Sequence, residues 1–118
     1  MNNKIKVYIA GALNADAVGY IKNVHKMIEW ADKIRRLGFS VYVPCLDFLM
    51  GMQLGDYEYS DYFDNSQPWL DESDLLFLVP GYEKSSGTAK EIKRAESKNI
   101  PVIDSFEEMQ DIIKEFTQ

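Results

Sequence analysis

The chain has 118 residues, and its 19 acidic residues against 13 basic ones give a net charge of −6. This length corresponds to one domain, residues 1–118, and an apolar content of 46% is typical of a globular protein rather than a disordered one. An acidic chain without a basic run is a poor ligand for duplex nucleic acid or an anionic membrane surface. One cysteine and one histidine exclude an internal disulfide and disfavour a transition-metal site. We therefore expect neither a metal nor a cofactor.

The ends and the apolar runs of the chain indicate where the protein works. No apolar run reaches the roughly 18 residues that a transmembrane helix needs. The chain begins Met-Asn-Asn-Lys-Ile-Lys and enters a predicted strand at once, without the pattern of a signal peptide. These features predict a cytoplasmic protein with no membrane partner.

Strands and helices alternate along the chain. Apolar runs bounded by turn residues predict buried strands at 5–10, 39–43, 75–79 and 100–103. Helical spacing predicts helices at 20–37 and 88–98, and a capping box of Ser105 and Glu108 predicts a last helix. This alternation implies parallel βαβ units, and hence an α/β fold: a small Rossmann-like or flavodoxin-like parallel sheet of four to five strands flanked by helices.

The segment 44–67 shows no clear periodicity and is rich in Tyr, Asp and Gly, so we expect an irregular connection, with 68–73 as the end of a short helix. A connection this long in a small domain is usually functional, and its aromatic residues argue against disorder. The aromatic residues of 56–64 either stack on a flat ligand such as a nucleobase or fill a core or a subunit interface. The sequence leaves both interpretations open.

In parallel α/β sheets, ligands bind at the carboxyl ends of the strands, near the point where the strand order reverses. The loop after the strand at 75–79 is the most informative one. Here Ser85, Ser86, Gly87 and Thr88 bring small residues and free amide groups to the start of a helix, which suits a phosphate or a carboxylate. Because the net charge does not attract phosphate, any such preference must come from this local site.

Two carboxylates near this loop are candidates for chemistry. Glu91 follows Thr88 by three residues, so it either projects toward the pocket beside the anion site or completes a capping box with Thr88. Asp74 precedes the strand at 75–79, where a turn residue is common, and its spacing alone places it at the end of the strand away from the site.

The sequence contains, in this order, Tyr8-Ile9-Ala10-Gly11, Asp74-Leu75-Leu76-Phe77-Leu78 and Ser85-Ser86-Gly87-Thr88-Ala89-Lys90-Glu91. Together these segments resemble the nucleoside 2-deoxyribosyltransferase superfamily, which includes the 2′-deoxynucleoside 5′-monophosphate N-glycosidases. The stretch from Pro80 to Glu91 is also similar to the Pro-Gly-aromatic-Glu-x-Ser-x-Gly-x-x-x-Glu loop of small uncharacterised phage and bacterial proteins. The resemblance extends over nearly the whole chain in the order of its elements.

The resemblance implies a role for several residues. Glu91 falls on the nucleophile that attacks the anomeric carbon of deoxyribose, where an anion stabilises an oxocarbenium-like transition state. Asp74 falls on an aspartate near the reacting base or sugar, and Tyr8 and Gly11 fall on residues that line the pocket. Ser85 stands where the monophosphate glycosidases hold the 5′-phosphate and the transferases carry an aspartate, which favours a nucleotide ligand over a nucleoside.

The expected activity is therefore cleavage or transfer at the N-glycosidic bond of a 2′-deoxynucleoside or its 5′-monophosphate. Relatives complete each site with a neighbouring subunit, so the resemblance also implies a homodimer or a larger homo-oligomer. Trp30, Trp69 and the Tyr-rich segment 56–64 offer apolar surface for that interface.

Two other functions fit parts of the same sequence. Many relatives follow the nucleophile with a small apolar residue and glycine, whereas this chain has Ile92-Lys93. A non-catalytic nucleotide-binding or sensing module on the same fold is therefore an alternative. Gly87-Thr88-x-x-Glu91 also resembles the loop of lysine-decarboxylase-like ribosyl-monophosphate hydrolases, but the inserted residues 82–86 and the short chain argue against that assignment.

Overall fold

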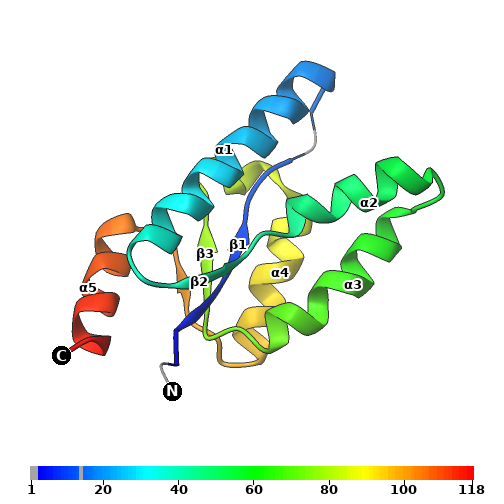
Figure 1. Ribbon diagram of the computed structural model, residues 1–118. Helices are drawn as coiled ribbons and strands as arrows, with labels where there is room; N and C mark the ends of the chain where they lie inside the picture. The colour runs from blue at the N-terminus through cyan, green and yellow to red at the C-terminus, as the bar shows by residue number, and fades with distance from the viewer. Residues whose placement is uncertain (1–2, 14) are drawn as a thin grey trace.

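The computed structural model describes residues 3–13 and 15–118. Its centre is a parallel four-stranded sheet with the strand order β2-β1-β3-β4, flanked by helices on both faces (Figure 1). The strands are β1 (Lys6–Ala10), β2 (Ser40–Tyr42), β3 (Leu75–Leu78) and β4 (Val102–Ile103). The helices are α1 (Ala17–Arg36), α2 (Asp47–Leu54), α3 (Tyr59–Asp71), α4 (Ser86–Ser97) and α5 (Phe106–Phe116), with short 3₁₀ turns η1 (Pro44–Leu46) and η2 (Tyr82–Lys84). This arrangement confirms the predicted α/β class, and its strand order is that of flavodoxin-like sheets. None of the described helices is both long and apolar enough to cross a membrane.

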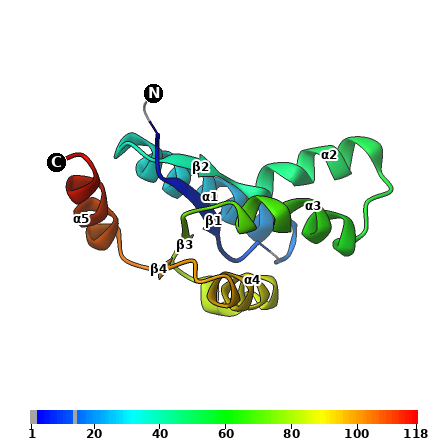
Figure 2. The ribbon, with the colours of Figure 1, turned by 90° about the horizontal axis from the view of Figure 1, so that it is seen from below.

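Alternate residues of the two central strands pack into two separate cores. Odd-numbered residues of β1 and β3 face α1 and α5, and even-numbered residues face α3 and α4. Figure 2 shows α5 on one side of the sheet and α3 and α4 on the other. This follows from the two-residue repeat of a strand. As a result Tyr8, an even-numbered residue of β1, is fully buried on the face that carries α4.

Helix α1 begins three residues before the predicted start at residue 20. The side chain of Asp16 caps the helix by accepting a hydrogen bond from the Gly19 amide at 2.7 Å. The first turn is exposed, with Val18 at 63%, so it lacks the apolar spacing on which the prediction depended. After the helix, Gly38 has a φ of 117°, a left-handed conformation that glycine adopts without strain and that commonly follows the end of a helix.

The prediction that 44–67 is irregular is wrong, because this segment forms η1, α2 and most of α3. Four apolar side chains of α2, those of Leu49, Met50, Met52 and Leu54, are exposed, so these residues do not form a buried stripe of the kind that predicts a helix. Helix α3 starts with a capping box, in which the Asp61 carboxylate accepts a hydrogen bond from the Glu58 amide at 2.7 Å.

The predicted apolar surface is present in part: Trp69 and Tyr59 are exposed, whereas Trp30 is partly buried. Trp30 packs against Phe77 and Phe106, with ring centroids 5.7 and 6.1 Å apart, so it belongs mainly to the core beneath α1. Trp69 stacks on Tyr42 and remains 56% exposed. The exposed apolar side chains concentrate instead on and beside α2: Leu46, Leu49, Met50, Met52 and Leu54.

Candidate active site

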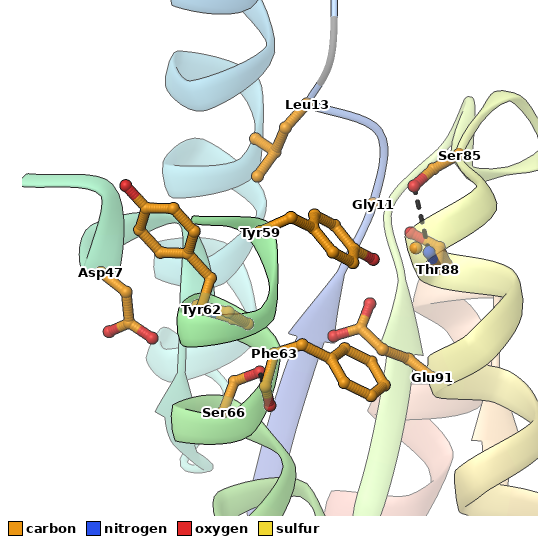
Figure 3. Close-up of a pocket in the computed structure, with 12 residues that line it drawn as sticks. Gly11, Leu13, Asp47, Tyr59, Tyr62, Phe63, Ser66, Ser85, Thr88 and Glu91 are labelled. Atoms are coloured by element: carbon orange, nitrogen blue, oxygen red, sulfur yellow. Dashed lines mark hydrogen bonds between the residues drawn. The ribbon is translucent and has the colours of Figure 1, made fainter. Parts of the chain in front are cut away.

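A cavity of about 290 Å³ opens at the carboxyl edge of the sheet, between the end of β1, helix α3 and the first turns of α4 (Figure 3). We call it the Glu91 cavity. Tyr59, Tyr62 and Phe63 of α3 form one wall, and residues of α4 form the opposite wall. Gly11 lines the cavity at the end of β1, where a Cβ atom would lie 3.0 Å from the Cβ of Val79. A small residue at this position therefore keeps the strand end close to β3.

Glu91 lies in the second turn of α4 and lines the cavity. The hydroxyl of Tyr8, on the central strand, donates a hydrogen bond to its Oε2. Burial raises the pKa of Glu91 to about 7, although the hydrogen bond from Tyr8 opposes this shift. No lysine or arginine is among the described residues that line the cavity, so the ionised carboxylate has no cationic partner there.

Tyr8 holds the Glu91 carboxylate from a rigid position. The side chain is fully buried, and its ring lies 5.6 Å from that of Tyr42. Burial and the neighbouring Glu91 carboxylate both raise the pKa of Tyr8 far above its ordinary value. The phenol therefore stays protonated at neutral pH and acts as a hydrogen-bond donor.

The start of α4 decides between the two interpretations of Glu91. Ser85 is the N-cap residue: its hydroxyl accepts from the Thr88 amide at 3.0 Å, and its carbonyl accepts from the Ala89 amide at 3.2 Å. A capping box of Thr88 with Glu91 is therefore wrong, because the cap lies three residues earlier than that interpretation requires. Glu91 is left free to line the cavity instead.

The same cap leaves amide groups available at the amino end of α4. Within the described chain, the amides of Ser86 and Gly87 have no recorded acceptor, as expected for the first residues of a helix. Gly87 lines the cavity, and a Cβ atom there would lie 3.1 Å from the hydroxyl of Tyr59. Of the predicted anion-binding residues, Ser85, Gly87 and Thr88 line the Glu91 cavity, whereas Ser86 is exposed and does not line it.

The structure does not bring Asp74, a predicted catalytic residue, to the cavity. Its carboxylate accepts a hydrogen bond from the Lys6 amide at 2.8 Å, and its own amide donates to the Lys6 carbonyl at 2.9 Å. Asp74 therefore joins the amino ends of β1 and β3, as its position before the strand indicates. This placement corrects the expectation that Asp74 lies near a reacting base or sugar.

Several cavity residues were not predicted individually. The cavity-facing residues of α3 are Tyr59, Tyr62, Phe63 and Ser66, which occupy positions i, i+3, i+4 and i+7. This is helical spacing, so a search for it within 44–67 would have found the wall. Asp47 of α2 also lines the cavity, and its carboxylate accepts hydrogen bonds from Tyr42 at 3.0 Å and Asn65 at 3.3 Å.

Metal and thiol chemistry find no support among the described residues. No group of three or more His, Cys, Asp or Glu side chains in that part of the chain is placed to hold a metal ion. Cys45 is buried in the core beneath α1, and burial raises the pKa of its thiol to about 11. A thiol with this pKa is a poor nucleophile at neutral pH.

A second cavity, of about 260 Å³, lies at the same edge of the sheet beside α1. We call it the Lys26 cavity. Lys26 and Lys84 contribute its positive charges, and Asn23 contributes an amide. The ammonium group of Lys26 donates to the carbonyl of Pro80 at 2.7 Å, and Asn23 donates to the carbonyl of Leu13 at 3.2 Å. The side chains of Lys26 and Asn23 therefore already have partners within the protein.

The fold and the cavity define a small flavodoxin-like α/β protein with a buried carboxylate at the carboxyl edge of its sheet. The chain belongs to the family described as Domain of unknown function (DUF4406), which it matches over residues 5–104. It is also similar to the crystal structure of a conserved protein from Enterococcus faecalis V583, with 25% sequence identity and a TM-score of 0.60. That similarity covers 85% of this chain and 62% of the other, so this chain spans less than two thirds of the other protein's length. No curated protein matches the chain significantly.

Proposed function

We propose that this protein cleaves or transfers the N-glycosidic bond of a 2′-deoxynucleoside or, as the amides at the start of α4 favour, its 5′-monophosphate. One observation carries the proposal: the Glu91 carboxyl group lines an open cavity, its pKa is raised by burial, and it accepts a hydrogen bond from the hydroxyl of Tyr8. A desolvated carboxylate without a cationic partner is suited to attack an electron-poor carbon, because the developing positive charge supplies the missing partner.

The proposed reaction proceeds in two steps. The Glu91 carboxylate attacks C1′ of the sugar while the bond from C1′ to the base nitrogen breaks, and the base leaves with the electron pair and takes up a proton. A water molecule or a second base then attacks C1′, loses a proton, and releases the Glu91 carboxylate. Tyr8 orients the carboxylate through its hydrogen bond in the resting protein.

The walls of the cavity match the two ends of a nucleotide. Tyr59, Tyr62 and Phe63 present aromatic rings of the kind on which nucleobases stack. At the other end, the amides of Ser86 and Gly87 and the dipole of α4 favour a phosphate. A protein with a net charge of −6 needs such a local site to bind an anion.

The second candidate is a non-catalytic nucleotide-binding or sensing module. The pKa of Glu91 favours it, since a carboxyl group with a pKa of about 7 is neutral in roughly half of the molecules at neutral pH. A neutral carboxyl group donates a hydrogen bond to a ligand instead of attacking it. Ile92 and Lys93, which replace a small apolar residue and glycine of many relatives, are consistent with this alternative.

The deciding experiment measures release of free base by chromatography. The unaltered chain is incubated with each 2′-deoxynucleoside, each 2′-deoxynucleoside 5′-monophosphate and the matching ribonucleotides, alone and with a second free base as acceptor. Glu91→Gln is compared with Glu96→Gln, which removes the same charge from an exposed position of the same helix. We expect release by the unaltered chain and by Glu96→Gln, and none by Glu91→Gln. Full activity of Glu91→Gln would show that the nucleophile is assigned wrongly, and binding without release would support the second candidate.

A further inference from the structure

Thr88 carries a buried polar atom that the protein itself does not satisfy. The residue is 1% exposed, and its Oγ1 is the one buried side-chain oxygen or nitrogen of the described residues that has no hydrogen-bond partner. Buried polar groups in native proteins are nearly always paired, because an unpaired one destabilises the folded state. An exception in the wall of a cavity indicates a hydrogen bond that a ligand completes.

The position of Thr88 restricts which part of a ligand it meets. It lies in the first turn of α4 and lines the Glu91 cavity between Ser85 and Glu91 (Figure 3). Residues three apart lie on the same face of a helix, about 4.5 Å apart along its axis. The Thr88 amide already donates to the Ser85 hydroxyl, so the side-chain hydroxyl is the group that remains for a ligand.

We propose that the Thr88 hydroxyl binds the 3′-hydroxyl of the sugar and makes the site selective for ligands that carry one. This inference rests on the proposed function, which places C1′ at Glu91 and the 5′-phosphate at the amino end of α4. The sugar then lies across the turn that holds Thr88. In a 2′-deoxynucleoside 5′-monophosphate the 3′-hydroxyl is the one free hydroxyl of the sugar, and it can both donate and accept, as the threonine hydroxyl can.

Thr88→Val tests this assignment because valine keeps the shape of threonine and removes the hydroxyl. Without ligand, the variant loses an unsatisfied buried group, so its thermal unfolding midpoint rises by about 4 °C. Its affinity for a 2′-deoxynucleoside 5′-monophosphate falls about tenfold. A rise in the unfolding midpoint together with a fall in affinity is the result that identifies a ligand-binding threonine. Replacement of a threonine with a purely structural role would lower the midpoint instead. Thr88→Ser keeps the hydroxyl and retains the affinity.

Thr117→Val is the matched control. The hydroxyl of Thr117 donates to the Ile113 carbonyl at 3.0 Å, near the end of α5 and away from the cavity. The same substitution there leaves the affinity unchanged and does not raise the unfolding midpoint. A rise in midpoint or a loss of affinity in Thr117→Val equal to that in Thr88→Val would overturn the assignment of both effects to the cavity.

The identity of the ligand group is tested with a pair of ligands. A 2′-deoxynucleoside 5′-monophosphate and the 2′,3′-dideoxy analogue with the same base are titrated calorimetrically against chains that carry Glu91→Gln, so that turnover does not interfere. With Thr88 present, the deoxynucleotide binds about tenfold more tightly than the dideoxynucleotide; with Thr88→Val, the two bind equally. Preference that survives Thr88→Val, or absence of binding by both ligands at millimolar concentration, overturns the inference.

Base release by the unaltered chain separates failure of this inference from failure of the proposed function. If base is released but Thr88→Val keeps the preference for the 3′-hydroxyl, the contact is wrong and the reaction stands. If no base is released but the preference depends on Thr88, the contact stands and the catalytic proposal fails.

Discussion

Two cavities of similar volume, about 290 and 260 Å³, lie at the carboxyl edge of the same sheet, beside the point between β1 and β3 where the strand order reverses. They differ in the state of their polar groups. The Glu91 cavity contains a carboxyl group with a raised pKa and the unpaired hydroxyl of Thr88. In the Lys26 cavity, Lys26 and Asn23 already donate to backbone carbonyls. Position in the fold therefore does not tell which cavity is the functional site. The Glu91 cavity stands out because its buried carboxyl group and its unpaired hydroxyl both destabilise the folded protein, which is typical of functional sites.

The largest effect that we expect is on the free energy of unfolding, and it comes from the buried carboxyl group of Glu91. Its pKa is about 7 in the folded protein against 4.5 in the unfolded chain, so the folded state holds the proton more tightly. The contribution of Glu91 to stability is therefore fully present below pH 4.5 and is lost as the pH rises through 7, by about 3 kcal/mol in all. Glu91→Gln removes this loss, so the variant should be more stable than the unaltered chain at pH 8 and little changed at pH 4. Urea unfolding at both pH values, with Glu96→Gln as control, measures it; equal stability at pH 8 would contradict a costly buried carboxylate.

The assembly state tests whether the Glu91 cavity is complete in one chain. Helix α2, which carries exposed apolar side chains, lies beside α3, whose aromatic residues line this cavity (Figure 1), and no residue of α2 lines the Lys26 cavity. We expect a homodimer or a larger homo-oligomer with two-fold symmetry. Light scattering at micromolar concentration measures the mass, and a monomer would refute the prediction. Leu49→Asp, which places a charge on this surface, should dissociate the assembly.

Gly51 supports the aromatic wall. A Cβ atom at this position of α2 would lie 1.7 Å from the hydroxyl of Tyr62, so Gly51→Ala forces α2 and α3 apart or displaces the Tyr62 ring. We expect a loss of about 1–3 kcal/mol in the free energy of unfolding and weaker nucleotide binding. Met50→Ala, at an exposed position of the same helix, serves as the control for chemical unfolding. Unchanged stability of Gly51→Ala would show that the two helices do not pack this closely.

The strands were predictable because continuous apolar runs correspond to buried parallel strands. The helices α1, α4 and α5 were predictable because each has apolar residues that pack on the sheet, among them Ile34, Ala95 and Ile113. Helix α2 was not, since the side chains of Leu49, Met50, Met52 and Leu54 are exposed. Helix α3 has a regular inward face, but its Tyr and Asp residues resemble the composition of a loop. The predicted elements are therefore those whose apolar residues follow the spacing of a strand or a helix. Helices α2 and α3 were missed because exposed apolar residues in one, and Tyr and Asp residues in the other, obscure that spacing.

The candidate site was predictable only in part. Ser85, Gly87 and Glu91 share one loop and helix, so their proximity follows from local spacing. Tyr8 and Glu91 are 83 residues apart in the sequence, and no local pattern predicts their hydrogen bond. The resemblance suggested both residues for the pocket, yet it also suggested Asp74, whose hydrogen bonds hold the opposite end of the sheet. Only the tertiary structure shows that Tyr8 and Glu91 meet at the cavity and that Asp74 does not.

The smallest effects that we expect are on the affinity for nucleotides, and they test which of the two cavities binds the phosphate. We expect 2′-deoxynucleoside monophosphates to bind more tightly than the matching nucleosides, and Gly87→Val to remove most of that difference. A Cβ atom on Gly87 would lie 3.1 Å from the Tyr59 hydroxyl, and the two further methyl groups of valine crowd the amides that face the phosphate.

Lys84 lines the Lys26 cavity but directly precedes Ser85, so it is the cation closest in sequence to the proposed phosphate site. Its side chain is exposed, and an exposed ion pair contributes only about 0–1 kcal/mol. Lys84→Ala should therefore weaken monophosphate binding less than fivefold, and Lys26→Ala, whose ammonium group is already bonded to the Pro80 carbonyl, should weaken it less still. Calorimetric titration of each nucleoside and monophosphate pair measures both. A larger loss with Lys26→Ala than with Gly87→Val would move the phosphate to the Lys26 cavity, because only a ligand held there draws on that charge more than on the amides of α4.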